Sequence, residues 1–363
     1  MRVLDASRVL AGPYCAYLLG LLGADVMRVE RPQGDSVRWR SRANPSLGGV
    51  GLSTDYIAQA ANKRVVYLDL SQARDREAFL KQLSNSDVLV ENFRTGALAR
   101  LGLDDQAMLQ AQPSLIWCSI RAYGERGPQA AFPAYDSVIQ AASGLMQLTG
   151  DSASGPMKAG APLIDYATGM NAALGVVSAV LAQVRKPGAS RVEVSMLDSA
   201  LALMQSTVSG HLNGEESLTG RGNAASSGNA LSQCYETADG RICIAVNEPH
   251  QRRALLQVLG VHEPDSSARS TDTALVTSVI AKVKSRASAE LAAALNRAGV
   301  PSSPVQSLDA AVAQALEADP DFARPMPGDL SLRCVGLPFR LNGSRGRLES
   351  GVEPHPDMGI HGN

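Results

Sequence analysis

"RVLDASRVLAGPYCAYLLGLLGADVMRVE", residues 2–30, is the stretch that decides the fold. Its first apolar residues are typical of a strand, and Pro13 suits the first turn of a helix. The apolar residues that follow keep helical spacing as far as Gly23, and "DVMRVE" (25–30) has the pattern of a second strand. The stretch therefore predicts a β-α-β unit.

The same alternation continues along the chain. Further strands are predicted at 64–70, 87–93, 115–124 and 190–195, and helices at 71–86, 134–147, 166–185 and 196–206. Ser71 is the expected N-cap of the first of these helices. Strands that alternate with helices indicate a parallel sheet covered on both faces, so we predict an α/β fold. Residues 233–246 predict a hairpin that turns at Asp239-Gly240.

Composition excludes several classes of function. The chain has 34 Lys and Arg against 35 Asp and Glu, so no electrostatic signal for nucleic acid or a membrane surface is present. Five cysteines without a C-x-x-C pair, and five scattered histidines, predict neither disulfides nor a metal site and favour the cytoplasm. We expect no signal peptide and no apolar run long enough to span a bilayer.

The first β-α-β unit resembles a dinucleotide site only in part. Gly12 follows the first strand and Glu30 ends the second, but "AGPYCAYLLG" lacks the pattern G-x-G-x-x-G. Pro13 also removes a backbone donor at the start of the helix. The unit is therefore not expected to hold NAD, and no redox cofactor is predicted.

Six phrases, in this order, carry a resemblance to a known family. They are "VLDASRVLAGPYCAYLLGLLGADVMRVERPQGD" (3–35), "NKRVVYLDL" (62–70), "DVLVENFRTGALARLGL" (87–103), "YDSVIQAASGLMQLTG" (135–150), "GAPLIDYATGMNAALGVVSAVL" (160–181) and "GRGNA" (220–224). Together they resemble the family III CoA-transferases, a group that includes formyl-CoA transferase, carnitine CoA-transferases and the divergent α-methylacyl-CoA racemase.

The resemblance implies an architecture. It predicts a Rossmann-like large domain at 1–205 that is completed by about 320–363, a linker at 206–225, and a smaller α+β domain at 226–319. It also implies that two subunits interlock as a homodimer, and that the partners are an acyl-CoA and a carboxylic acid. Coenzyme A is then the substrate carrier, with no metal.

Asp165 has two interpretations. Asp is among the commonest helix caps, so Asp165 is a candidate N-cap of the helix that begins at Tyr166. In the family it falls where the transferases keep a nucleophilic aspartate, which would form an aspartyl-CoA thioester. The helix N-terminus would favour the ionised carboxylate, and its backbone N–H groups are candidates to hold an oxyanion.

Other positions match family contacts to CoA. The matching residues are Ala11, Arg31, the run Leu68, Asp69, Leu70 and Ser71, then Asn92, Phe93, Arg94, Arg100 and Tyr135. Taken alone, the arginines are ordinary surface charges and the apolar residues are ordinary packing. The resemblance implies that the arginines hold phosphates.

Two alternatives to a transferase stay open. In the racemase branch a histidine lies where Tyr135 stands here, and a racemase needs two bases around the α-carbon. Tyrosine, with a pKa of about 10, is a poor base near neutral pH. A CoA-binding protein without catalysis is the second alternative. Leu10 and Pro133 depart from formyl-CoA transferase, which argues against formate and oxalate as substrates.

Overall fold

The computed structural model describes residues 1–39, 52–215, 220, 222–225, 228–262, 271–353 and 355. The chain forms two compact units. The first comprises Met1–Met146, Lys158–Ser217 and Ala315–Asn363, and the second comprises Gln147–Met157 and Leu218–Gln314. The second unit thus includes 147–157, which the predicted boundaries placed in the large domain.

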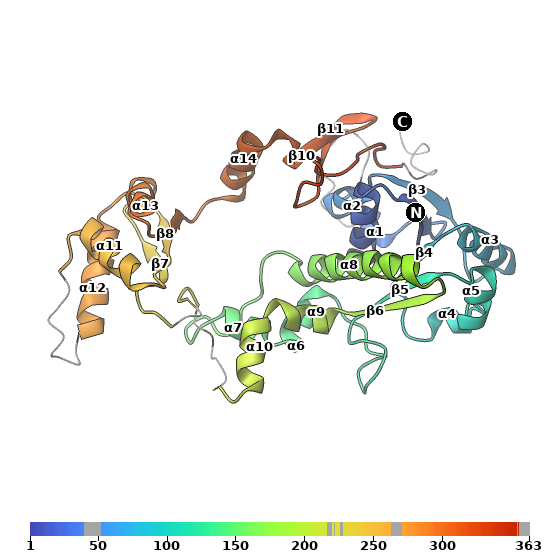
Figure 1. Cartoon of the computed structure of the whole chain (residues 1–363), viewed down its shortest axis with the longest axis horizontal. Helices are drawn as coiled ribbons and strands as arrows, with labels where there is room; N and C mark the ends of the chain where they lie inside the picture. The colour runs from blue at the N-terminus through green and yellow to red at the C-terminus, as the bar shows by residue number, and fades with distance from the viewer. Residues whose placement is uncertain are drawn as a thin grey trace. The chain divides into compact units, whose positions relative to one another are not determined.

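A six-stranded sheet of parallel strands is the centre of the first unit (Figure 1). Its order is β3-β2-β1-β4-β5-β6. The strands are β1 (Arg2–Asp5), β2 (Asp25–Glu30), β3 (Lys63–Tyr67), β4 (Val88–Glu91), β5 (Ile116–Arg121) and β6 (Ser190–Ser195). The order reverses between β1 and β4, and in open parallel sheets a ligand binds beside such a point, outside the carboxyl ends of the strands. The predicted α/β fold with a parallel sheet is confirmed.

Helices cover both faces of this sheet (Figure 1). Val88 and Val90 of β4 face the core shared with α1 (Ala11–Leu21), α2 (Thr54–Ala60) and α8 (Leu163–Arg185). Leu89, between them, faces the opposite core, which includes α3 (Ala73–Ser84), α4 (Ala97–Arg100) and α5 (Asp105–Ala111). The alternation follows from the two-residue period of a strand.

Two glycines allow close approaches at the start of α1. A Cβ on Gly169 of α8 would lie 2.7 Å from the carbonyl oxygen of Ala11, so only glycine permits this helix contact. A Cβ on Gly12 would lie 2.3 Å from Cβ of Ser7. Gly12 therefore allows the start of α1 to pack closely on Ser7 of the β1–α1 loop.

Several helix starts differ from the predictions. The N-cap of α3 is Gln72 and not Ser71, whose hydroxyl donates to Asp69 instead. The helix predicted at 134–147 is two short helices, α6 (Asp136–Ala142) and α7 (Leu145–Thr149). The segment predicted as one helix at 196–206 divides likewise into α9 (Met196–Leu203) and α10 (Gln205–Leu212). The first unit ends with a hairpin of β10 (Ala323–Met326) and β11 (Asp329–Val335).

Helix α8 overturns one expectation. By length and composition it is apolar enough to cross a membrane, with a mean hydropathy of 1.4, whereas no such run was expected. One side of it packs against α1, β5 and β6, and its other side exposes apolar side chains.

The second unit has its own core. The predicted hairpin is confirmed as β7 (Gln233–Glu236) and β8 (Arg241–Ile244), to which β9 (Ser302–Pro304) adds a third antiparallel strand. Helices α11 (Pro249–Leu259), α12 (Thr271–Lys284) and α13 (Ser288–Arg297) contribute to this core. Helix α14 (Leu308–Ala318) lies across the boundary between the units.

Candidate active site

A cavity of about 670 Å³ lies within the first unit, at the carboxyl ends of the strands. We call it the arginine cavity. Loops that follow β1, β2, β4 and β5 contribute most of its lining, as expected beside the point where the strand order reverses. It is lined by Arg8–Ala11, Arg31, Ser36, Asn92–Thr95, Ala97, Arg100, Ile120–Ala122, Ala130–Tyr135, Val138, Asp165 and Met196.

Asp165 lines this cavity although only 8% of its surface is exposed. Helix α8 begins at Leu163 and not at Tyr166, so Asp165 is its third residue, and the N-cap position belongs to Pro162. No side chain at that position caps the helix. The interpretation of Asp165 as an N-cap is therefore wrong, because the helix starts one turn earlier than its apolar pattern indicates.

The capping role belongs to Asp136 instead. Its Oδ2 accepts the backbone N–H groups of Ile164 at 2.7 Å and Asp165 at 3.1 Å. Gln140, one turn along α6, donates to Oδ1 of Asp136 and accepts the N–H of Ala159 at 2.9 Å. Asp136 and Gln140 are both buried, so α6 fixes the chain on both sides of Pro162.

This capping also contradicts the expectation that backbone N–H groups at the start of α8 are candidates to hold an oxyanion. The remaining N–H groups of the first turn of α8 donate to backbone carbonyls, Leu163 to Ala161 and Tyr166 to Pro162. All four amides at this helix end are thus engaged in the structure, and none is open to an oxyanion. A buried carboxylate from another element satisfies donors that the helix itself leaves unpaired.

The arginines of the cavity fall into two kinds. Arg121 is neutralised by Glu91 at 2.8 Å and by Glu125 at 3.0 Å. Among the residues that the structure describes, four cavity arginines form no ion pair: Arg8, Arg31, Arg94 and Arg100. Burial and the charge of Arg31 lower the pKa of Arg8, and the charge of Asp35 opposes this shift in part. Unpaired guanidinium groups gathered in this way favour a ligand with several phosphates.

Asn92 and Phe93 lie in the cavity with defined contacts. The Asn92 side chain accepts the N–H of Arg8 and donates to the carbonyl of the same residue, both at 2.8 Å. The guanidinium carbon of Arg8 lies 5.2 Å from the centre of the Phe93 ring. The amide of Asn92 is therefore committed to the backbone of Arg8, and Phe93 supports the side chain of that arginine.

The structure gathers most, not all, of the predicted site residues. Ala11, Arg31, Asn92–Arg94, Arg100, Tyr135 and Asp165 line the arginine cavity. The run 68–71 does not: Leu68 and Leu70 are in the core beside α3, and Asp69 hydrogen-bonds to Ser71. The run lies after β3, at the same edge of the sheet. The roles of all these residues in binding stay predictions.

Three residues of the site escaped sequence reasoning. Arg8 lies within "ASRVLAG" (6–12) without a charge pattern around it, and Asp136 and Gln140 belong to the matched phrase 135–150, in which the resemblance assigns a CoA contact to Tyr135. The spacing of Asp136 and Gln140, four residues apart on a helix, was the available signal.

Comparison with known proteins is consistent with this geometry. The model of CoA-transferase family III matches residues 1–361. The succinyl-CoA:mesaconate CoA-transferase of Haloarcula marismortui is 33% identical over 320 residues, which cover 85% of this chain and 80% of that protein. The succinate–glutarate CoA-transferase of Agrobacterium fabrum is 32% identical over 385 residues, covering 99% and 92%.

A solved structure shares the fold. The crystal structure of a CAIB/BAIF family protein from Brucella suis matches with a TM-score of 0.83 and 27% identity, covering 99% of this chain and 97% of that one. The family model spans nearly the whole chain, and full-length relatives carry the same activity name. This chain therefore belongs to CoA-transferase family III and is a CoA-transferase.

Proposed function

We propose that the arginine cavity binds acyl-CoA and that Asp165 is the nucleophile of the transfer. One observation carries the proposal: a buried carboxylate lines the same cavity as four arginines that form no ion pair with any described residue. The arginines suit the phosphates of CoA, which carry most of its charge. A carboxylate at this position can act as the nucleophile that attacks a thioester carbonyl.

The proposed reaction keeps atoms and charges balanced in four steps. Asp165 attacks the thioester carbonyl of the donor, which gives a mixed anhydride and the CoA thiolate. The thiolate attacks the aspartyl carbonyl, which gives an aspartyl-CoA thioester and releases the donor acid. The acceptor carboxylate then attacks this thioester, which gives a second mixed anhydride and again the CoA thiolate. The thiolate attacks the acceptor carbonyl of this anhydride, which gives the acceptor acyl-CoA and releases the Asp165 carboxylate. Covalent catalysis divides one difficult exchange into easier steps.

Asp136 positions the nucleophile in this scheme. It holds the backbone of Ile164 and Asp165 through buried hydrogen bonds, and Gln140 holds the preceding loop. The backbone that carries Asp165 is therefore held by α6 before substrate binds. Such pre-organisation lowers the cost of reaching the reactive geometry.

The acyl groups are proposed from relatives. The relatives from Haloarcula marismortui and Agrobacterium fabrum are named for transfer between succinate and mesaconate or glutarate. We therefore propose short dicarboxylates as donor and acceptor. A racemase is less well supported, because Tyr135 is 61% exposed at the cavity and no histidine precedes His211.

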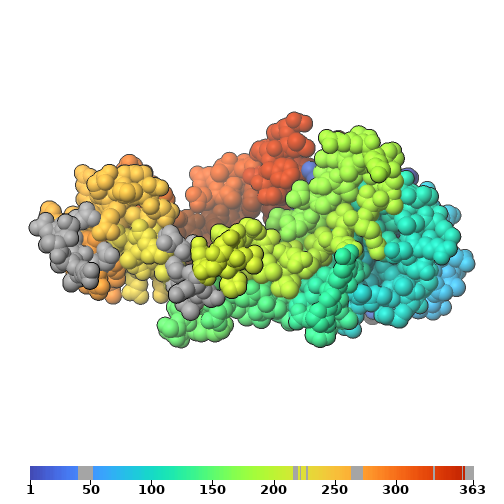
Figure 2. All heavy atoms as spheres, turned by 60° about the horizontal axis from the view of Figure 1, so that its bottom comes forward, coloured from blue at the N-terminus to red at the C-terminus, as the bar shows by residue number. Residues whose placement is uncertain are grey.

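The homodimer is a further part of the proposal. Residues coloured lime to yellow, which include α8, α9 and α10, lie on the face that Figure 2 shows. On α8 the side chains of Met170, Leu174, Leu181 and Val184 are between 42% and 79% exposed. Apolar side chains that recur along one helix and are exposed suit an interface. Light scattering on the purified protein should give twice the mass of one chain.

The cytoplasmic location also stays a proposal.

The test is a transfer assay with succinyl-CoA and glutarate, in which glutaryl-CoA is measured by chromatography. We expect Asp165→Ala to lose about a thousandfold or more in rate, as removal of a nucleophile does, and to retain CoA binding. Asp198→Asn is the matched control, since Asp198 is an exposed acid in the first turn of α9. An Asp165→Ala variant that transfers CoA at the native rate would exclude the covalent mechanism.

A further inference from the structure

One of the three residues between β1 and α1 that line the cavity has an unusual backbone. Val9 has a φ of 68°, in the left-handed region. A β-branched residue rarely adopts this conformation, and where one does, the surroundings must hold it there. Val9 lies between Arg8 and Leu10, and all three line the arginine cavity. The strain is therefore located within the wall of the site.

Three side chains hold every backbone polar group of Arg8 and Val9. Asn92 accepts the N–H and donates to the carbonyl of Arg8. Asp35 Oδ2 accepts the N–H of Val9 at 3.1 Å, and Gln59 Nε2 donates to the carbonyl of Val9 at 2.6 Å. We call Asp35, Gln59 and Asn92 the backbone clamp. Its members follow β2, lie in α2 and follow β4, so three separate elements converge on one dipeptide.

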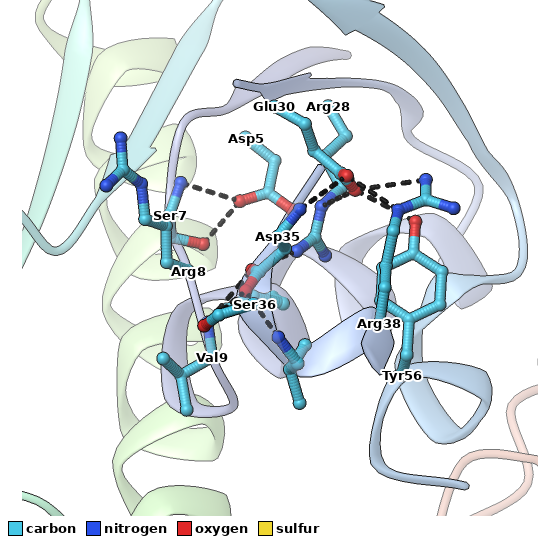
Figure 3. A network of polar contacts seen from close by, with 12 residues as sticks. Asp5, Ser7, Arg8, Val9, Arg28, Glu30, Asp35, Ser36, Arg38 and Tyr56 are labelled. Atoms are coloured by element: carbon cyan, nitrogen blue, oxygen red, sulfur yellow. Dashed lines mark hydrogen bonds and ion pairs between the residues drawn. The ribbon is translucent and has the colours of Figure 1, made fainter. Parts of the chain in front are cut away.

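Asp35 is itself fixed by a buried ionic cluster (Figure 3). Arg28 Nη2 lies 2.7 Å from Asp35 Oδ2, and the N–H of Asp35 donates to Glu30 at 2.9 Å. Glu30 in turn pairs with Arg28 at 2.8 Å and with Arg38 at 2.7 Å. These charged side chains have at most 2% of their surface exposed. The position of Asp35, which accepts the N–H of Val9, is therefore set by these buried charged residues.

We propose that the backbone clamp is a positioning device for CoA binding, which rests on the proposed function of the cavity. By holding Val9 in its strained conformation, it directs the Arg8 side chain over Phe93 and sets Leu10 and Ala11 in the cavity wall. Without the clamp, the backbone of Val9 leaves the left-handed region, and the Arg8 side chain leaves its position over Phe93. The clamp residues act on the ligand through Arg8 and the loop.

Gln59 offers the cleanest test. It is fully buried, and among the described residues its Oε1 has no hydrogen-bond partner. Gln59→Leu therefore removes the bond to Val9 and an unsatisfied buried atom together, and we expect the melting temperature to stay within a few degrees of the native value. We expect the dissociation constant for free CoA, measured by calorimetry, to rise about tenfold, because the left-handed strain is released.

A double-mutant cycle separates positioning from a general structural effect. Val9→Gly removes the free-energy cost of a left-handed backbone at position 9, since glycine adopts this conformation freely. In the Val9→Gly background we expect Gln59→Leu to weaken CoA binding by about twofold at most. An equal loss in both backgrounds, or no loss in either, would overturn the proposal. Gln59→Met repeats the cycle if the leucine variant does not fold.

The outcomes also separate this proposal from the function on which it rests. If the native protein binds no CoA, the proposed function of the cavity and the positioning role of the clamp are both wrong. If the native protein binds CoA and Gln59→Leu binds it equally well, only the positioning role is wrong.

Discussion

Two groups of arginines in the first unit have the same chemistry and opposite surroundings. Arg28 and Arg38 are fully buried and paired with Glu30 and Asp35. Arg31, Arg94 and Arg100 are exposed in the cavity and form no ion pair among the described residues. The first group holds the β1–α1 and β2 loops, and the second is available to a ligand. Pairing, and not residue type, separates an arginine that supports a site from one that binds at it.

The largest effect on stability is expected in the buried group. Glu30→Gln removes a carboxylate that contacts Arg28, Arg38 and the hydroxyl of Tyr56 at 2.9 Å, and leaves buried cations unpaired. We expect the free energy of unfolding to fall by about 3–5 kcal/mol at pH 7, measured by urea denaturation. A loss below about 1 kcal/mol would mean that the cluster contributes no more than a surface pair.

The pH dependence of this loss sharpens the comparison. Burial alone raises the pKa of Glu30, but the charges and hydrogen bonds of Arg28 and Arg38 outweigh it, so the pKa lies below its usual 4.5. The contribution of Glu30 is therefore complete above pH 4.5 and is lost as the pH falls through the lower folded value. We expect the difference in free energy of unfolding between the native protein and Glu30→Gln to be constant from pH 7 to pH 5. This difference should become smaller in more acid solution. If the difference in free energy of unfolding already becomes smaller above pH 5, the lost stability belongs to another titrating group.

A smaller effect, on binding alone, is expected at the cavity. Arg100→Gln removes an exposed cation that pairs with no acid among the residues described, so we expect the KM for acyl-CoA to rise about tenfold while the free energy of unfolding stays unchanged. The native KM should also increase with salt, because exposed charges are screened. Unfolding of Arg100→Gln at lower urea than the native protein would show that this arginine is structural after all.

The smallest effect is expected at an exposed pair outside both groups. Arg64 lies 2.9 Å from Asp25, with more than half of each side chain exposed. We expect Arg64→Gln to change neither stability nor KM measurably, since exposed pairs contribute little. A loss comparable to that of Glu30→Gln would remove the distinction between buried and exposed pairs.

Sequence reasoning succeeded where the signal is local. The strands 25–30 and 190–195 have the predicted bounds, because their apolar alternation is bounded by turn residues. Caps were predicted less well: the start of α8 depends on Asp136, which lies 29 residues before Asp165. The contact between Asn92 and Arg8 joins positions 84 residues apart. Such pairs arise from the sheet order, and no local pattern predicts them.

The resemblance to a family named Asp165 and seven other residues that line the cavity, but not their surroundings. It did not distinguish Arg121, which is paired with Glu91, from Arg100, which forms no ion pair within the described part of the chain. It did not find the backbone clamp either, since Asp35, Gln59 and Asn92 belong to separate segments. Their roles follow from contacts in three dimensions.

One measurement tests the central claim most directly. The protein is mixed with succinyl-CoA, hydroxylamine is added, and the peptide that contains Asp165 is weighed by mass spectrometry. An activated aspartyl anhydride or thioester reacts with hydroxylamine, so we expect a hydroxamate on Asp165 and none on Asp198. An unmodified Asp165 in a protein that binds CoA and transfers it to glutarate would contradict the covalent mechanism.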